Sequence, residues 1–382
     1  MKFSKIIGQQ NIKKHLTQSA GSGRIPHAQL FIGPEGSGVL PMAIAYAQYI
    51  ICKNMGDENA GGNAACNLKF ENFQHPDIHY VFPVATNESV GSKPISDNFL
   101  DQWFEFLKTD IYGNINDWYE HLDIKNKQGN ISVHEATNII KKLSLKSFEG
   151  GYKVMIIWMA EKMNTEASNK LLKLLEEPTD KTVFILIAED EKAILQTILS
   201  RCQVLHFNKL AANDIQEALI NYENCDVSEA AIIANSSQGN YNKALKILNH
   251  TENDLPFEQW FITWVRAAFR ANKNAKVISD LINWSDEISG IGREKQKKFL
   301  EYCMEMFRQA LLINYKVNEL VYIKPEDATF KLENFAPFVN DKNILDIYQE
   351  LSDAMYHVER NGNPKIIFTD LSIKLTRLIH RK

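Results

Sequence analysis

A glycine-rich turn near the N-terminus has the spacing of a phosphate-binding loop. It reads Gly33-Pro34-Glu35-Gly36-Ser37-Gly38 and follows the apolar run at residues 28–32. Such a turn between a strand and a helix directs backbone N–H groups toward an anion. The full pattern, G-x-x-x-x-G-K-[ST], adds a lysine for the phosphates and a hydroxyl for Mg²⁺. Here Gly33, Gly36 and Gly38 keep the glycine pattern, but Val39 replaces the lysine and Leu40 replaces the hydroxyl.

The metal-binding half of such a site is also incomplete. An ATPase of this type places an acidic residue at the end of a buried strand to position Mg²⁺. The corresponding run continues as Trp158-Met159-Ala160-Glu161, so Glu161 lies later than the expected aspartate. Phosphoryl transfer depends on positioning and charge, so these losses together predict that the chain does not hydrolyse nucleotide. A glycine-rich turn is also common where no nucleotide binds, and the sequence leaves open whether this loop holds a nucleotide or an anion.

The elements that would position this loop alternate along the first half of the chain. Apolar runs predict strands at 28–32, 78–82, 153–158, 182–187 and 203–207. Helical patterns lie between them at about 41–52, 133–145 and 165–176. This alternation predicts a parallel sheet flanked by helices. Residues 84–130, termed the insertion below, mix aromatic and polar residues and predict an ordered segment that contains helix.

The second half of the chain has a helical pattern. Residues 211–250 predict three short helices, and longer helical segments follow from about residue 255. The final helix begins after Asn363-Pro364 and carries one apolar stripe. The predicted domains are an α/β domain at 1–208, a small helical domain at 209–252 and a C-terminal helical domain at 253–382. Three domains agree with the roughly two or three that this length predicts.

Composition limits the class of protein. A hydrophobic fraction of 45% excludes disorder as the main state, and a net charge of −4 argues against a free-standing, strongly basic nucleic-acid binder. The five cysteines are odd in number and scattered, which favours reduced intracellular thiols over a disulfide scaffold. No signal-peptide pattern and no apolar run of about 18 residues occurs, so we expect a soluble, cytoplasmic protein.

Several motifs in order give the chain a specific resemblance. The string from Pro26 to Gly38, the segment NTEASNKLLKLLEEP at 164–178 and the tripeptide Ser200-Arg201-Cys202 resemble bacterial DNA polymerase III clamp-loader subunits of the AAA+ family. The resemblance covers about residues 3–208 and continues more weakly to the end of the chain. The defective phosphate loop and the missing acids resemble the delta-prime type within this family, because the motor subunits keep an intact loop.

The resemblance implies a fold, a role and a set of partners. The fold would be an AAA+ α/β domain, a helical lid domain and a helical collar domain that joins subunits. Arg201 would act as an arginine finger that reaches ATP held by a neighbouring motor subunit, with Ser200 and Cys202 shaping its turn. The implied partners are motor subunits of the gamma/tau type, a clamp-opening delta subunit, the sliding clamp and primer–template DNA. By itself, a tripeptide of this kind is as consistent with a surface arginine that caps a helix.

Two departures from the family pattern affect ligand binding. The family often carries a four-cysteine zinc module, but only Cys52 and Cys66 fall in the corresponding region, so we expect neither a bound metal nor a cofactor. His75 and His79 are weak additional ligands. Asn242 stands where active relatives carry a nucleotide-sensing arginine.

A basic cluster raises the question of direct DNA contact. Lys141, Lys142, Lys146 and Lys153 lie close together in the sequence. They fit a face toward primer–template DNA in an assembled loader, and they fit a solvated helix face equally well.

The leading hypothesis is a non-hydrolysing clamp-loader subunit that helps load the sliding clamp on primed DNA during replication. Two alternatives stay open. The chain would be an ATP-hydrolysing motor subunit of the same loader, or a degenerate AAA+ adaptor outside replication. The first predicts ATPase activity from the isolated chain, and the second predicts no co-purification with motor subunits.

Overall fold

The computed structural model divides the chain into two compact units, Met1–Asn249 and His250–Lys382. The structure describes residues 1–53, 64–86, 90–124, 127–148, 151–249, 256–271, 277–317, 320–323, 325 and 327–381. The first unit contains both the predicted α/β domain and the predicted small helical domain. The boundary between those two at residue 208 stays a prediction.

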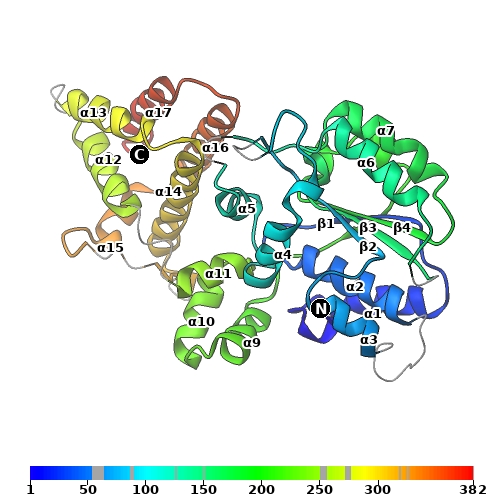
Figure 1. The fold of residues 1–382 in the computed structure, drawn as a ribbon. Coiled ribbons are helices and arrows are strands. Elements are labelled where there is room, and N and C mark those ends of the chain that lie inside the picture. Colours follow the sequence, from blue (N-terminus) through cyan, green and yellow to red (C-terminus); the bar gives the residue numbers. More distant parts are fainter. Residues whose placement is uncertain are drawn as a thin grey trace. The chain divides into compact units, whose positions relative to one another are not determined.

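A five-stranded parallel sheet forms the centre of the first unit (Figure 1). Its order is β2-β3-β4-β1-β5. The strands are β1 (Ala28–Ile32), β2 (Ile78–Val81), β3 (Lys153–Ile157), β4 (Thr182–Ala188) and β5 (Gln203–His206). All neighbouring strands pair in parallel. The predicted parallel sheet is therefore confirmed, as are the positions of its strands.

Helices cover both faces of this sheet (Figure 1). They are α1 (Gln10–Gly21), α2 (Val39–Lys53), α3 (Ala64–Glu71), α4 (Leu100–Thr109), α5 (Ile115–His121), α6 (Val133–Ser144), α7 (Thr165–Glu176) and α8 (Gln196–Leu199). Side chains alternate along each strand. Phe31 therefore packs on the face of α1, α2 and α4, and its neighbour Leu30 packs on the face of α6 and α7.

Helix α2 begins earlier than the sequence indicated. The predicted start was Pro41, but the helix includes Val39 and Leu40. Proline is tolerated in the first turn because the N–H groups there have no intrahelical acceptor. Both residues that replace the phosphate-loop lysine and hydroxyl therefore belong to the first turn of α2.

The insertion is ordered and largely helical where it is described. It contributes α4 and α5, and its aromatic residues Trp103, Phe106 and Trp118 are buried in the core on the α2 side of the sheet. Trp103 stacks on Phe82 at 4.3 Å between ring centroids, and Trp118 donates its indole N–H to the Pro83 carbonyl at 2.9 Å. The predicted ordered segment with helix is confirmed, and these contacts attach it to the end of β2.

Three short helices follow the sheet, as the sequence predicted. They are α9 (Ala212–Glu223), α10 (Val227–Ser236) and α11 (Tyr241–Leu248). Their apolar faces form a small core around Ile215, Leu219 and Ala244, which also contains Ile7 and Tyr112. Asn224, at the end of α9, has the left-handed φ of 55° that ends the helix.

The second unit is helical in the part that the structure describes. Its helices are α12 (Phe257–Ala271), α13 (Ile278–Ser289), α14 (Arg293–Asn314), α15 (Leu332–Phe335), α16 (Ile344–Glu359) and α17 (Pro364–Leu378). Trp264 and Trp284 stack at 5.0 Å in its core, and the Trp264 indole N–H donates to the Ser372 hydroxyl at 2.9 Å. The predicted final helix is confirmed, and Leu371 and Leu375 of its stripe are buried.

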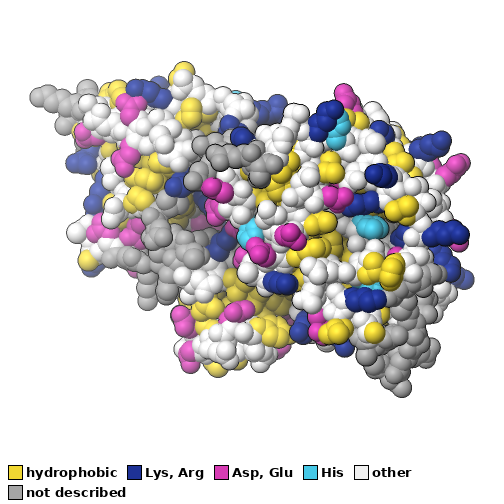
Figure 2. All heavy atoms as spheres, viewed as in Figure 1, with side chains coloured by type: hydrophobic (Ala, Val, Ile, Leu, Met, Phe, Trp, Pro, Cys, Tyr) yellow, Lys and Arg dark blue, Asp and Glu magenta, His cyan; other side chains and the backbone are white. Residues whose placement is uncertain are grey.

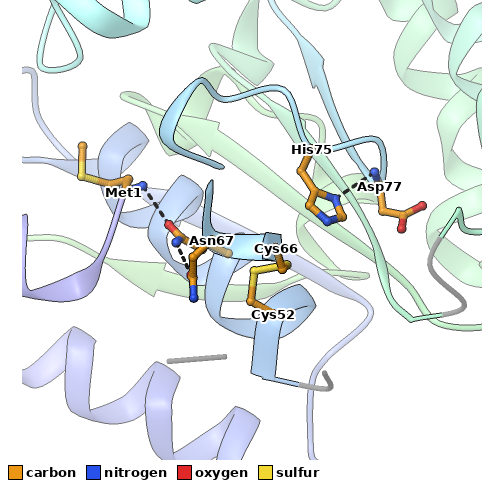
Figure 3. Close-up of a disulfide and its surroundings, with 7 residues drawn as sticks. Met1, Cys52, Cys66, Asn67, His75 and Asp77 are labelled. Atoms are coloured by element: carbon orange, nitrogen blue, oxygen red, sulfur yellow. Dashed lines mark hydrogen bonds between the residues drawn. A yellow bond between two sulfur atoms is a disulfide. The ribbon is translucent and has the colours of Figure 1, made fainter. Parts of the chain in front are cut away.

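The expectation of reduced thiols is wrong for two of the five cysteines. Cys52 and Cys66 form a disulfide between the end of α2 and the start of α3 (Figure 3). Their Cα atoms lie 5.6 Å apart because the two helices pack together. A sequence separation of 14 gives no sign of that packing. Cys202, Cys225 and Cys303 are free thiols.

Two further properties of the described residues are the hydropathy of their helices and the distribution of surface charge. None of the described helices combines the length and the apolar character needed to cross a bilayer. On the face drawn in Figure 2, basic and acidic side chains are interspersed.

Candidate functional site

The glycine-rich turn joins β1 to α2 as the phosphate-loop pattern predicts. Ser37 closes it by donating its N–H and its hydroxyl to the Pro34 carbonyl, at 3.2 and 2.5 Å. Gly36 and Gly38 have φ values of +67° and +87°, the left-handed region that glycine adopts without strain. Gly36 and Gly38 thus shape the turn in the place where the pattern predicted it.

The side chains that follow the turn cannot act on phosphate. Val39 and Leu40 are only 7% and 5% exposed and belong to the apolar core beneath the loop. Neither side chain carries a charge or a metal-binding oxygen. At the end of β3, Trp158 is buried and packs on Trp103 of the insertion at 5.2 Å. An indole therefore occupies the position that follows the strand.

Glu161, the first acidic residue after β3, contacts the end of β4. It lies beyond β3 in a short 3₁₀ turn, and one of its carboxylate oxygens accepts the Glu189 N–H at 3.0 Å. Burial raises the pKa of this carboxyl. Its contact is with the end of β4, so its visible role is to join two neighbouring strand ends.

The start of α11 lies against the turn. The Tyr241 N–H donates to the Gly36 carbonyl at 3.1 Å. A side chain at Gly36 would place its Cβ 2.9 Å from that same nitrogen and 1.9 Å from Asn240 Oδ1. The Asn240 amide also donates to the Glu35 carboxylate at 3.2 Å. The sequence did not indicate this contact, because the two segments are about 200 residues apart.

Arg201 lies in the turn between α8 and β5. Its guanidinium donates to the Thr197 carbonyl at 2.8 Å and to the carboxylate of Glu176 at the end of α7. Its side chain is 32% exposed. Guanidinium keeps its charge at every physiological pH and can bond two oxygens at once. The structure therefore leaves a permanent cation at the surface, held by contacts within the chain.

Ser200 and Cys202 support the turn that carries Arg201. Ser200 caps α8, and its hydroxyl donates to the Thr197 carbonyl at 3.2 Å. Cys202 packs against the core on the α7 side of the sheet. Burial raises the pKa of its thiol to about 11, so it stays a neutral, weakly reactive thiol near pH 7.

The four lysines of the basic cluster do not form one surface. Lys153 is buried, and its ammonium donates to the carbonyls of Leu143 and Leu145 at 2.6 and 2.7 Å, which caps the end of α6. Lys142 pairs with Asp97 of the insertion. Lys141 and Lys146 are exposed. Two of the four side chains are thus bonded within the fold.

Candidate metal ligands do not converge in the described part of the chain. Among those residues, no group of three or more His, Cys, Asp and Glu side chains comes together. Cys52 and Cys66 bond to each other, and the ring Nδ1 of buried His75 accepts the Asp77 N–H at 3.2 Å (Figure 3). The loss of zinc binding stays a prediction.

The fold and the site together define a parallel α/β chain with a glycine-rich loop between β1 and α2, in which Val39 and Leu40 stand at the lysine and hydroxyl positions of the phosphate-loop pattern. The family model described as "DNA polymerase III, delta subunit" matches residues 8–211. The chain belongs to this family of DNA polymerase III clamp-loader subunits.

Individual relatives are moderately similar. The chain is 30% identical over 246 residues to DNA polymerase III subunit delta' of Bacillus subtilis, covering 64% of this chain and 60% of that protein. It is 26% identical over 400 residues to subunit tau of the same organism, covering 100% of this chain and 62% of that protein. The match thus spans about three fifths of each relative's length.

Solved structures align only distantly. A gamma subunit-related protein of Thermotoga maritima aligns over 97% of this chain and 99% of its own, with 12% identity and a TM-score of 0.37. The RuvB branch migration motor of Thermotoga maritima aligns over 87% of this chain and 88% of its own, with 15% identity and a TM-score of 0.39.

Proposed function

We propose that the chain is a non-hydrolysing subunit of the DNA polymerase III clamp loader. In this role it completes the ATP site of a neighbouring motor subunit with Arg201 and helps load the sliding clamp on primed DNA. Membership of the family and the similarity to a delta' subunit support the assembly. Its partners would be motor subunits of the gamma/tau type, a clamp-opening delta subunit, the clamp and primer–template DNA.

The observation that carries the non-hydrolysing role is the burial of Val39 and Leu40 in the first turn of α2. Phosphoryl transfer needs cations and a metal ion to neutralise the charge that develops on the phosphate oxygens. Two buried aliphatic side chains supply neither. The similarity to a tau subunit over the whole chain favours a motor role as the alternative, and ATPase activity of the isolated chain would decide for it.

The position of Arg201 supports the finger role. An arginine finger contributes about 10³–10⁵ in rate by stabilising charge in the transition state. Arg201 is anchored by its own turn, and the carboxylate that it bonds, Glu176, is 46% exposed. Half-exposed ion pairs are weak, typically 0–1 kcal/mol. A phosphate of a neighbouring subunit would therefore replace Glu176 at small cost.

The test is reconstitution with the motor and clamp-opening subunits. We expect the Arg201→Ala complex to assemble but to lose about 10³-fold or more of its DNA-stimulated ATPase at the neighbouring site, and clamp loading with it. Arg24→Ala removes another exposed arginine of the first unit and serves as the matched control. Unchanged rates in Arg201→Ala would remove the finger role, and failure to assemble with any motor subunit would favour an adaptor outside replication.

A further inference from the structure

The connection between α4 and α5 of the insertion lies over the phosphate loop. Tyr112, in this connection, is buried, and its hydroxyl accepts the Ile7 N–H at 3.0 Å. A Cβ on Gly38 would be 3.2 Å from the Tyr112 ring. The ring also packs edge-on against Tyr241 at 5.0 Å. One side chain of the insertion thus contacts the end of the loop and the start of α11.

Two residues further along, the insertion bonds the loop itself. The Asn114 amide donates to Glu35 Oε1 at 2.9 Å. The same oxygen accepts from Asn240 at 3.2 Å and from Asn242 at 3.4 Å. Glu35 therefore joins the insertion, the loop and α11 at a single carboxylate oxygen.

A second carboxylate connects the insertion to α11 directly. Asp117, in the first turn of α5, accepts from the Asn242 amide at 2.7 Å and from the Lys246 ammonium at 2.5 Å. It also accepts the Asn114 N–H at 2.9 Å, which fixes its position on the insertion. The Asp117 and Lys246 side chains are 13% and 22% exposed, so water screens this ion pair little. Helix α5 accordingly lies beside α11 (Figure 1).

We propose that the insertion acts both as a plug of the phosphate loop and as a tether that holds α11. Tyr112 and Asn114 cover the phosphate loop, and Asp117 fastens α11 to it, so that α9–α11 stay closed on the α/β domain with no ligand between them. The charge at the loop is the opposite of what a polyphosphate requires. An intact loop offers a lysine, whereas this one offers the carboxylate of Glu35, which repels phosphate, and the nearby Lys246 ammonium is paired with Asp117.

This role concerns the isolated chain and does not depend on the proposed function in replication. It would hold for a chain that never binds a sliding clamp. Experiments could also overturn it without affecting the proposed finger role of Arg201.

Hydrogen exchange of the whole protein tests the tether between Asp117 and α11. In Asp117→Ala, we expect the backbone amides of α11 to exchange about tenfold faster or more, because the partly buried ion pair with Lys246 and the hydrogen bond from Asn242 are lost. Asp97→Ala is the matched control, because it removes an insertion ion pair that faces Lys142 on α6 instead. Lys246→Gln, which leaves the insertion unchanged, should accelerate the same amides. Equal exchange of α11 in Asp117→Ala, Lys246→Gln and the control would overturn the proposal.

Restoring the phosphate loop tests the plug. The double variant Val39→Lys, Leu40→Thr supplies the missing lysine and hydroxyl with the insertion intact. We expect no ATP–Mg²⁺ binding by calorimetry at millimolar nucleotide, with α11 exchange as slow as in the wild type. Binding of ATP by this variant would overturn the proposal, since the plug would then not close the site.

Discussion

Arg201 and Glu176 meet through a single carboxylate oxygen. The Arg201 Nε donates to Glu176 Oε1 at 2.6 Å, and a terminal guanidinium nitrogen bonds the same oxygen. Glu176 is the last residue of α7, and Arg201 follows α8, so the pair connects two helix ends across the chain's own surface. The guanidinium thus bonds a carboxylate of its own chain, whereas in the proposed function it would bond a phosphate held by a neighbouring subunit.

Breaking this contact distinguishes two roles for Glu176. Glu176 either competes with phosphate for the guanidinium of Arg201 or orients that guanidinium. In Glu176→Gln we expect the neighbouring site of the reconstituted loader to show a severalfold lower KM for ATP, because the guanidinium no longer has a competing anion. The free energy of unfolding should change by less than about 1 kcal/mol, as for other exposed pairs. Steady-state ATPase and urea titration measure the two effects. A loss of rate as large as that of Arg201→Ala would mean that Glu176 orients Arg201 instead of competing with phosphate for it.

Lys153 should matter for stability rather than for DNA. Lys153→Met removes the two hydrogen bonds that cap α6 and leaves the Leu143 carbonyl with only the Thr179 hydroxyl as donor, at 3.3 Å. We expect the chain to lose about 1–3 kcal/mol in urea denaturation. Lys141→Met, at an exposed position of the same helix, should lose almost nothing. Weaker DNA binding by the Lys153 variant, with unchanged stability, would contradict this structural role.

The disulfide should stabilise the first unit through the unfolded chain. It closes a loop with a sequence separation of 14, for which loop entropy predicts about 3 kcal/mol. The double variant Cys52→Ala, Cys66→Ala should unfold at lower urea, and reductant should shift the wild type toward it. Cys202→Ala retains the pair and should keep the wild-type response to reductant. A wild-type transition that ignores reductant would contradict the contribution of this bond.

Glu135 predicts a pH dependence of stability. Its carboxyl is buried, one oxygen accepts the Ser96 N–H at 2.5 Å, and the other oxygen has no partner among the described residues. Burial raises its pKa above the usual 4.5, although the hydrogen bonds from Ser96 oppose the shift. Above pH 4.5 the unfolded chain therefore releases this proton first, and the Glu135 contribution to stability falls as pH rises through the folded pKa.

Glu135→Gln isolates that contribution. The amide carries no charge to bury and retains an acceptor for Ser96. We expect its free energy of unfolding, relative to the wild type, to increase from acid to neutral pH. Glu217→Gln, at an exposed position on α9, should show no such trend. Parallel curves for Glu135→Gln and the wild type in urea titrations at several pH values would contradict the prediction.

The local patterns of the sequence predicted the sheet well. Runs such as Thr182–Ala188 are apolar on both faces, and Asn164 caps α7 by accepting the Ala167 N–H, so both elements were legible from neighbouring residues. The Ser200-Arg201-Cys202 turn also lies directly before the predicted strand at 203–207. These features depend on residues a few positions apart.

The contacts over the phosphate loop were not predictable in the same way. Glu35 and Asn242 lie in motif positions, but no motif pairs either of them with the other or with Asn114, and the bonds from Glu35 to the two asparagines join residues 79 and 207 positions apart. Lys153 belonged by sequence to a basic cluster, but the start of β3 places its ammonium under the end of α6. Side-chain partners of this kind are set by packing, which a single sequence does not display.

Gly36 retains a motif position for a reason unrelated to any ligand. Its carbonyl receives the Tyr241 N–H, and a Cβ there would collide with the N-cap of α11. Any larger residue would also be strained at a φ of +67°. The glycine spacing would therefore persist in a chain that never encounters ATP. A search that recognises phosphate loops by their glycines alone would therefore mistake this close approach of two backbones for a nucleotide-binding site.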